Sequence, residues 1–254
     1  MSLREECIKW CETNPGAGDE TLPVSEQFGP TIQGEGKHAG RAVQFLRLGH
    51  CNLSCSWCDT PYTWDKDRFD LSVELDDRTA ASIVENLIPG VALVISGGEP
   101  LMHQRKTAWA YLLHGAVSRG CEVHVETNGT LAPTGPTVEL VSHAAVSPKL
   151  AHAGDHGGRR APMFTNKWLT YMQGDTSLDA CLKYVVRDGS DVNEVTTITD
   201  GLGAPRSAVW VMPLGTSTEE LQARWPGVAR AAADSHINAS HRVHVLAWGD
   251  VKGT

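Results

Sequence analysis

The sequence predicts an α/β protein built around a mainly parallel sheet. Short apolar runs rich in β-branched residues alternate with helix-like stretches along most of the 254 residues. Polar or glycine-bearing motifs follow several of these runs directly, as loops do at the ends of strands. This alternation is typical of βα units, in which a helix returns the chain to the next parallel strand.

The elements are expected in the following chain order. The first 22 residues are polar and loop-like, so we expect a poorly ordered lead-in or a short helix over 1–22, followed by a single core domain over 23–254. Strands are expected at 42–48, 91–96, 122–127, 144–148, 182–186, 208–214 and 242–248. Helices are expected at 77–88, 106–120 and 217–236.

Terminal residues support the three helices. Asp77 is a candidate N-cap for the first helix, and Gly120 closes the second. The third helix begins with a capping-box pattern from Ser217 to Glu220, and Pro226 is expected to interrupt it. The histidines and glycines of "KLAHAGDHGGRR" (149–160) indicate a mobile, solvated loop rather than a histidine-rich metal site, because their spacing is irregular.

Composition narrows the setting of the protein. The net charge of −8 argues against a broad electrostatic contact with nucleic acid. No apolar run approaches the length of a membrane span, and the first residues have no apolar signal region, so no membrane partner is expected. The odd number of seven cysteines argues against a disulfide framework and favours a reducing cytoplasm.

Five motifs are expected to meet at one rim of the sheet, because each follows a predicted strand and the carboxyl ends of parallel strands share one edge. In chain order they are "GHCNLSCSWCDT", "GGEP", "ETNG", "SPK" and "MPLG". Any one of them alone is readily explained as a turn. Five together, with a thiol cluster, predict a functional site.

The thiol cluster consists of Cys51, Cys55 and Cys58. A structural zinc site needs four ligands, and a fourth thiolate from Cys7 or Cys11 is disfavoured because zinc ligands usually follow a tighter pattern. Those two cysteines instead fit one face of an N-terminal helix. A 4Fe–4S cluster held by three thiolates keeps one iron open to another ligand, which explains the count of three.

The spacing C-x-x-x-C-x-x-C, with GGEP about forty residues later, resembles the radical S-adenosylmethionine superfamily. The resemblance implies that the open iron binds S-adenosylmethionine and that cleavage of this cofactor releases a 5′-deoxyadenosyl radical. It also implies a methionine-binding role for GGEP. Gly97 and Gly98 allow close backbone approach, and the carboxylate of Glu99 can meet the ammonium group.

A longer stretch sharpens the resemblance. "FGPTIQGEGKHAGRAVQFLRLGHCNLSCSWCDTPYTWD" (28–65), with "ISGGEPL", "VETNGT", "VSPKL", "LKYVV" and "HVLAWGD", is similar to the 7-carboxy-7-deazaguanine synthase family over about 23–250. This resemblance implies an incomplete (β/α)6 TIM-like partial barrel of the radical SAM type, usually as a homodimer. It also implies conversion of 6-carboxy-5,6,7,8-tetrahydropterin to 7-carboxy-7-deazaguanine with loss of ammonia, in queuosine-type 7-deazapurine biosynthesis, with S-adenosylmethionine used catalytically.

The residues suit a pterin substrate. The "IQGEG" loop can offer backbone groups, the Gln33 amide and the Glu35 carboxylate to the pterin edge, and Arg47 can bind a carboxylate. Alternatives are a glycine-rich turn for the loop and a strand-end ion pair for Arg47. The expected substrate-binding residues are Ile32, Gln33, Gly34, Glu35, Arg47 and Ser96.

The resemblance implies a cofactor side as well. Trp57 can cover the adenine or the cluster, and Glu126 can hold ribose hydroxyls, although a buried structural role fits Glu126, Ser147, Lys149 and Met212 nearly as well. The expected cofactor-binding residues are Trp57, Asp59, Gly97, Gly98, Glu99, Glu126, Ser147, Lys149 and Met212. An electron donor such as flavodoxin or ferredoxin is an expected partner.

Thr60 is the expected magnesium ligand by resemblance, since Mg²⁺ is often held by few protein oxygens plus substrate and water. Its alternative is an ST-turn with the local backbone. Two departures from the family pattern stand out: His50 precedes the first cysteine, and the end of the chain is "LAWGDVKGT", so no substrate contact is assigned beyond Val245.

Two other functions remain open from sequence. A glycyl-radical activase would share the cysteine spacing and GGEP, but the "IQGEG" loop with Arg47 favours a small heterocycle as substrate. A zinc-stabilised, non-catalytic binding module would need a fourth metal ligand.

Overall fold

A computed structural model describes residues 1–156, 158 and 164–253. Within those residues, nine strands form one sheet in the order β3-β1-β2-β4-β5-β6-β7-β8-β9. The strands are β1 (Thr21–Ile32), β2 (Ala42–Leu48), β3 (Asp76–Thr79), β4 (Ala92–Gly97), β5 (Val123–Thr127), β6 (His143–Val146), β7 (Asp179–Val186), β8 (Val209–Pro213) and β9 (Asn238–Ala239).

The sheet from β2 to β9 is parallel, while β1 pairs antiparallel with both β2 and β3. Because β3 and β9 form its two edges, the sheet curves without closing, which confirms the predicted α/β partial barrel.

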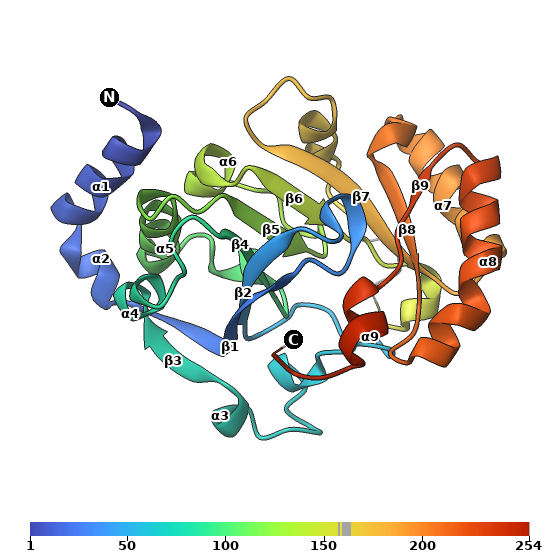
Figure 1. The fold of residues 1–254 in the computed structure, drawn as a ribbon, viewed down its shortest axis with the longest axis horizontal. Helices are drawn as coiled ribbons and strands as arrows, with labels where there is room; N and C mark the ends of the chain where they lie inside the picture. The colour runs from blue at the N-terminus through green and yellow to red at the C-terminus, as the bar shows by residue number, and fades with distance from the viewer. Residues whose placement is uncertain (157, 159–163, 254) are drawn as a thin grey trace.

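The helices cover the outer face of the sheet, with α4, α5 and α6 on one side and α7 and α8 on the other (Figure 1). The α-helices are α1 (Leu3–Thr13), α2 (Pro15–Asp19), α3 (Leu71–Glu74), α4 (Ala80–Glu85), α5 (Thr107–Ser118), α6 (Pro136–Leu140), α7 (Gly189–Leu202), α8 (Thr218–Asp234) and α9 (Val243–Trp248). Short 3-10 helices are η1 (Gly36–His38), η2 (Pro61–Thr63), η3 (Pro100–His103), η4 (Ala151–Ala153), η5 (Asn166–Met172) and η6 (Arg206–Ala208).

The core lies between the sheet and these helices. Leu93, Val94 and Ile95 of β4 are consecutive and fully buried, as expected for a parallel strand covered on both faces. Trp109 of α5 is also fully buried, and its indole N–H donates to Thr137 Oγ1 at 3.0 Å. Burying each large apolar side chain contributes about 1.5–3 kcal/mol, so this layer holds the loops at the strand ends in place.

The first 22 residues form two helices and the start of a strand. Ser2 caps α1, because its hydroxyl accepts from the Glu5 backbone while the Glu5 carboxylate accepts from the Ser2 backbone. The antiparallel strand β1 was not among the predicted strands. Its polar outer positions and Pro30 hide the strand pattern, although Leu22 and Val24 are buried.

The predicted helix over 77–88 is shorter than expected, and Asp77 is not its N-cap. Residues 76–79 instead form the edge strand β3, paired with the start of β1. Helix α4 begins at Ala80, where Thr79 Oγ1 accepts from the Ser82 backbone. Pairing with β1 satisfies the backbone of this segment in a way that sequence pattern alone does not reveal.

The predicted strand over 242–248 is wrong, because these residues form helix α9. The last place in the sheet belongs to β9, a two-residue strand paired with β8. The run is too short for periodicity to separate a strand from a helix, and only Val245 within α9 is buried.

Pro226 does not interrupt the third predicted helix, since α8 runs through it from Thr218 to Asp234. Leu221, Val228 and Ala232 are buried along one face of α8, so packing against the sheet maintains the helix across the missing N–H. Ser217 caps α8, as predicted, by accepting from the Glu220 backbone at 3.2 Å.

Two connections bear on the site. The segment between β1 and β2 reaches across the sheet to β7 (Figure 1), where Lys37 pairs with Asp179 at 2.8 Å. In the loop predicted over 149–160, η4 is described, whereas 157, 159 and 160 lie outside the described residues. No described helix combines the length and apolar character needed to cross a bilayer.

Candidate active site

The carboxyl ends of the parallel strands surround a pocket of about 300 Å³. Every predicted site residue except Glu99 lines this pocket. Those residues are Ile32, Gln33, Gly34, Glu35, Arg47, Cys51, Cys55, Trp57, Cys58, Asp59, Thr60, Ser96, Gly97, Gly98, Glu126, Ser147, Lys149 and Met212. Residues at or after the ends of β2, β4, β5, β6 and β8 therefore converge with residues 32–35 at the end of the antiparallel strand β1.

The three cysteines lie on the loop after β2 and pack in one small cluster with Leu53 and Trp57. Burial raises the pKa of Cys51 to about 12, and it also raises the pKa of Cys55. Buried thiolates are therefore disfavoured unless a cation compensates their charge. The donor set fits a bound metal centre.

The three cysteine sulfurs are not gathered as tightly as the ligand atoms of a single metal ion. In the described part of the chain, only His38, His143 and Asp179 bring three ligand atoms within 4.8 Å of one another. Thiolates on one zinc ion, at about 2.3 Å from the metal, would lie roughly 3.8 Å apart. The cysteine sulfurs are more widely separated than that, and they would have to close in on a lone zinc ion.

The cysteine loop is locked to the GGEP turn by backbone contacts. The Gly98 N–H donates to Leu48 O at 3.0 Å, and the Glu99 N–H donates to His50 O at 2.7 Å. A Cβ on Gly98 would stand 2.0 Å from His50 O, and one on Gly97 would stand 2.0 Å from Leu48 O. These two glycines are needed because no side chain fits between the two loops.

Glu99 is fully buried and lies outside the pocket lining. Its carboxylate accepts from the Leu101 N–H at 3.0 Å, from Thr127 Oγ1 at 2.8 Å and from the Asn128 N–H at 2.7 Å. Burial raises its pKa despite these donors. In this conformation Glu99 ties the GGEP turn to the end of β5 instead of facing the cavity.

The floor of the pocket carries a buried chain of charges that the sequence reasoning missed. Lys183 Nζ lies 2.6 Å from Glu35 Oε2 and 3.2 Å from Glu126 Oε1. Burial raises the pKa of Glu35 and of Glu126, but Lys183 acts with Arg242 on Glu35 and with Ser96 on Glu126, and together they hold both pKa values below their usual range. Two carboxylates are thereby kept ionised inside the pocket.

Two polar side chains join the same chain of charges. Gln33 Nε2 donates to Glu126 Oε1 at 3.2 Å, and Ser96 Oγ donates to Glu126 Oε2 at 2.8 Å. Gln33 Oε1 accepts from the Glu35 N–H at 3.3 Å. The "IQGEG" loop is therefore not a plain turn, because its side chains are oriented by Glu126 on β5 and by Lys183 on β7.

Arg242, just before α9, was also missed. Its guanidinium donates to Glu35 Oε1 at 2.8 Å and to Asp59 Oδ2 at 2.5 Å. Gly34 packs so closely on His244 that a Cβ would stand 1.7 Å from its Nδ1. The C-terminal segment thus lines the pocket, although the sequence offered no basis for assigning it a contact.

Arg47 does form an ion pair, with Glu26 Oε2 at 3.1 Å, and it faces the pocket as well. Tyr62 donates to the other oxygen of Glu26 at 3.0 Å. Burial would lower the pKa of Arg47, but the neighbouring acidic groups raise it overall. Arg47 therefore stays charged and oriented beside the cysteine loop.

The side of the pocket near the third cysteine carries aromatic groups and a lysine. Lys149 Nζ donates to Ser147 Oγ at 2.9 Å and stands 5.5 Å above the Trp57 ring. Trp64 Nε1 donates to Cys58 Sγ at 3.3 Å. These contacts suit a ligand with a flat ring and polar substituents.

Thr60 lies in the pocket wall with its hydroxyl 3.7 Å from Cys58 Sγ. It precedes η2, where its carbonyl accepts from Thr63, yet its side chain makes no capping hydrogen bond there. The ST-turn alternative therefore does not describe this conformation.

One sequence signal could have revealed part of the missed network. Lys183 lies within the apolar run "LKYVV", and a lysine in a fully buried strand requires a charged partner. Glu26 and Arg242 gave no comparable signal, because each lies in a mixed polar segment.

Comparisons with known proteins agree with this site. The Radical SAM superfamily matches residues 47–147, from the end of β2 to the start of the "SPK" motif. The chain is 34% identical to a 7-carboxy-7-deazaguanine synthase of Pyrobaculum aerophilum, over 88% of this chain and 93% of the relative. It is also 34% identical to a 7-carboxy-7-deazaguanine synthase of Halobacterium salinarum, over 96% of each chain.

Among solved structures, the fold is similar to QueE from Escherichia coli, with a TM-score of 0.61. The match covers 87% of this chain and 93% of that one at 22% sequence identity, so it concerns the fold alone.

Proposed function

Because this chain belongs to the 7-carboxy-7-deazaguanine synthase family and is a radical SAM enzyme, we propose that it converts 6-carboxy-5,6,7,8-tetrahydropterin to 7-carboxy-7-deazaguanine with loss of ammonia. One observation carries this proposal: the cysteine loop, which suits a metal centre, and the Gln33–Glu35 segment, which suits a small heterocycle, line the same pocket. This reaction belongs to 7-deazapurine biosynthesis of the queuosine type.

Cys51, Cys55 and Cys58 would hold a 4Fe–4S cluster, a role supported by their packing in one cluster that lines the pocket. S-adenosylmethionine bound at such a cluster would supply the 5′-deoxyadenosyl radical. The backbone at Gly97 and Gly98, which lines the pocket, would accept the cofactor's amino-acid end. Glu99 would act by holding this turn.

Further side chains would bind the rest of the cofactor. The Trp57 ring and the Lys149 ammonium offer an aromatic face and a donor beside Cys58. The remaining residues assigned to this side are Asp59, Ser147 and Met212. Glu126 is better suited to the substrate, since its carboxylate is bound to Ser96 and to Gln33.

The pterin would lie on the charged floor. Glu35 and Glu126 are ionised acceptors for the N–H groups of the pterin edge, and Gln33 adds an amide. Arg47 would meet the substrate carboxylate with its guanidinium, which is only partly used by Glu26. Burial of this floor excludes water from the reacting ring.

Mg²⁺ would bind at Thr60 together with substrate oxygens. The Thr60 hydroxyl faces the pocket without a backbone partner, which supports this role. One neutral hydroxyl binds Mg²⁺ weakly, so the ion should bind well only with substrate present. Stimulation of turnover by Mg²⁺ should therefore fall in Thr60→Ala at unchanged iron content.

The expected partners belong to the proposal too. An electron donor such as flavodoxin or ferredoxin would reduce the cluster, and the enzyme would act as a homodimer in a reducing compartment such as the cytoplasm. All seven cysteines are free, which supports such a compartment.

The alternatives are less well supported. A pocket of about 300 Å³ with a buried charged floor suits a small polar heterocycle better than a protein substrate of a glycyl-radical activase. A zinc-stabilised module would require sulfurs closer together than those of this loop.

The test is anaerobic turnover of the carboxytetrahydropterin in the presence of a reductant and S-adenosylmethionine. Formation of 7-carboxy-7-deazaguanine is the quantity measured. Cys51→Ala, Cys55→Ala and Cys58→Ala should each lose bound iron, with Cys121→Ala as the matched control. Glu35→Gln and Arg47→Ala should lose turnover while keeping uncoupled cofactor cleavage. A colourless protein holding stoichiometric zinc after anaerobic reconstitution would refute the proposal.

A further inference from the structure

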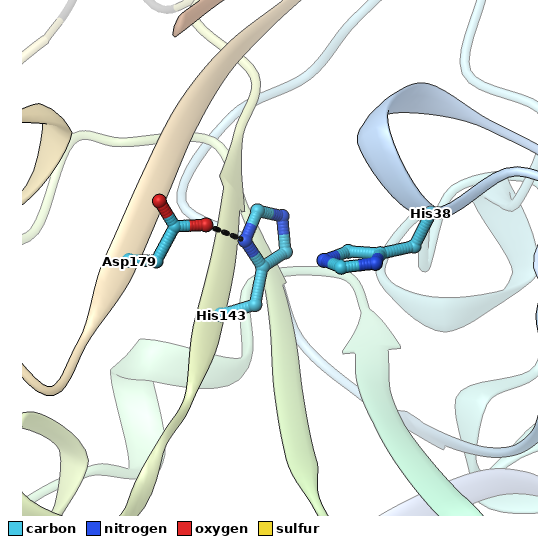
Figure 2. A group of neighbouring side chains, drawn as sticks. All are labelled: His38, His143 and Asp179. Carbon is cyan, nitrogen blue, oxygen red and sulfur yellow. Dashed lines mark hydrogen bonds and ion pairs between the residues drawn. The ribbon is translucent and has the colours of Figure 1, made fainter. Parts of the chain in front are cut away.

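A second group of metal-ligating side chains lies at the opposite end of the sheet from the pocket. His143 begins β6 and Asp179 begins β7, and the two residues are paired in register. His38 comes from η1, in the segment between β1 and β2. Figure 2 shows the His143 ring between Asp179 and His38, with all three side chains converging.

The geometry is close to that of a metal site. One ligand atom from each of the three side chains lies within 4.8 Å of the other two. Asp179 Oδ2 and His143 Nδ1 are 2.7 Å apart. In a tetrahedral site with metal–ligand bonds of about 2.0–2.2 Å, the ligand atoms are roughly 3.3 Å apart. Side-chain shifts of about 1 Å would therefore bring these three residues to the spacing of a metal site.

The His38 imidazole is in the state that a metal requires. Burial, followed by the neighbouring His143 and His124, lowers the pKa of His38 to about 4, so the ring is neutral at physiological pH. The contacts of this ring in the described part of the chain are with two other imidazoles, at centroid distances of 4.7 Å and 4.4 Å. A metal would therefore displace no hydrogen bond of His38.

The surroundings supply an outer shell. His124 is bound to Glu122 at 2.7 Å, and Cys181 Sγ lies 3.7 Å from His143 Nε2. Lys37 pairs with Asp179 at 2.8 Å and is the competing cation. Both members of that pair are substantially exposed, so their interaction is worth at most about 1 kcal/mol and yields readily to a metal ion.

We propose that His38, His143 and Asp179 form a second metal site, which binds a divalent transition ion of the Zn²⁺ type. Two imidazoles and one carboxylate are ligands that suit zinc, and water can complete the coordination. On binding, the metal takes the place of the proton shared by His143 Nδ1 and Asp179 Oδ2, and the Lys37 ammonium moves to solvent.

The site would tether the segment that forms the pocket floor. His38 is three residues from Glu35, and Lys183 lies on the same strand, β7, as Asp179. A metal joining η1 to β6 and β7 would thus limit the motion of the "IQGEG" segment relative to the buried lysine. This role is structural and does not depend on the reaction proposed above.

The experiment is zinc binding to the holoenzyme, reconstituted with iron and sulfide so that the pocket cysteines are occupied. Zn²⁺ alone is titrated calorimetrically, and retained metal is measured by elemental analysis after dialysis. Wild-type protein should bind one equivalent of zinc beyond the cluster. Loss of even an outer-shell partner weakens metal binding about 10–100-fold, so His38→Ala and Asp179→Asn should weaken it at least that much.

The matched control is His114→Ala. His114 is another partly buried histidine, close to a thiol, with its Nδ1 3.4 Å from Cys7 Sγ. This variant should bind zinc as wild type does. In wild type, millimolar Mg²⁺ should not compete with Zn²⁺ for the site, because imidazole suits zinc better than magnesium. Equal zinc binding by wild type, His38→Ala and Asp179→Asn would overturn the site, as would no retained zinc in wild type.

Hydrogen exchange gives a second measurement. Zinc should slow amide exchange over residues 33–41 in wild type and in His114→Ala, but not in His38→Ala. Zinc binding without such protection would overturn the tethering role. Because neither measurement uses turnover, failure of the reaction proposed above would leave this outcome unaffected.

Discussion

Lys183 is the residue on which the pocket floor depends. It is 4% exposed on a strand where Leu182, Tyr184 and Val186 belong to the core, and its ammonium lies between two carboxylates from different parts of the chain. Burial alone would lower its pKa, but Glu126 and Glu35 raise the pKa above the usual lysine range. Removing this one charge would leave two like charges facing each other.

Lys183→Met should destabilise the protein by about 3–5 kcal/mol, because it leaves buried carboxylates without their partner. Chemical denaturation measures this loss. The double variant Lys183→Met with Glu126→Gln should recover part of the stability, since one unpaired carboxylate is gone. A double variant less stable than Lys183→Met would show that the two side chains are not coupled in this way.

Lowering the pH should weaken the interactions of Lys183 with Glu35 and Glu126. Glu126 has an ordinary pKa of 4.5, which burial raises most strongly in the folded protein, but Lys183 and the hydrogen bond from Ser96 together bring the pKa below that value. A carboxyl group with a lowered folded pKa stabilises the protein fully above its unfolded pKa and loses that contribution as pH falls through the folded value. Stability should therefore fall below about pH 4.5.

Urea midpoints measured from about pH 7 to pH 3 test this prediction. Glu126→Gln should show a shallower acid loss than wild type, because it takes up one proton fewer on unfolding. Carboxyl groups with lowered pKa values outside the pocket floor, such as Glu122, act equally in both proteins. Parallel profiles for the two proteins would contradict the assignment.

Among the elements, the GGEP turn is packed directly against the backbone of the cysteine loop. It is held against the cysteine loop by two backbone hydrogen bonds, and no atom fits between the Gly98 Cα and His50 O. The turn therefore sets where the cysteine loop lies, before any ligand binds.

Gly98→Ala should displace the cysteine loop and reduce bound iron, with a loss of stability of about 1–3 kcal/mol or more from overpacking. Iron content after reconstitution and a denaturation midpoint measure both effects. Gly227→Ala in α8 is the matched control, because a Cβ there meets nothing within 4 Å. Its helical position predicts unchanged or slightly raised stability. Normal iron content in Gly98→Ala would show that the loop tolerates the shift.

At the scale of the whole molecule, the N-terminal helices that stabilise the outer layer lie apart from the pocket. Helices α1 and α2 lie against α5 on the outer side of the sheet, away from the pocket (Figure 1). Trp10 stacks on His114 at 4.2 Å, Arg4 donates to Ser118 O at 2.9 Å, and Cys7 is fully buried. These contacts stabilise the outer layer without reaching the cysteine loop.

Deletion of residues 2–14 should lower the thermal midpoint by roughly 5–10 °C, because it removes an aromatic stack, a hydrogen bond and buried surface worth a few kcal/mol. Iron content and turnover at low temperature should remain near wild type. A scanning calorimeter and an iron assay make the comparison. Loss of iron in this variant would mean that the N-terminal helices do support the site.

The sequence alone determined the parallel α/β layout, the cysteine loop and most of the pocket lining. These features are encoded locally: a buried parallel strand is a continuous apolar run, and "GHCNLSCSWCDT" or "GGEP" is contiguous in the chain. Because parallel strands end at one edge, motifs that follow them had to meet. Gln33 follows no predicted strand, and its assignment to the same site as Cys55 came from the family resemblance.

Only the tertiary structure decided which distant residues pair. The contacts of Lys183 with Glu35, of Arg242 with Asp59 and of His38 with Asp179 join segments that no local pattern connects. Tertiary contacts also decided that β1 is a strand and that α9 is a helix. A short segment of mixed polarity adopts the secondary structure in which neighbouring elements satisfy its backbone hydrogen bonds. A buried charge or an edge strand takes its stability from partners elsewhere in the chain, and these exist only after folding.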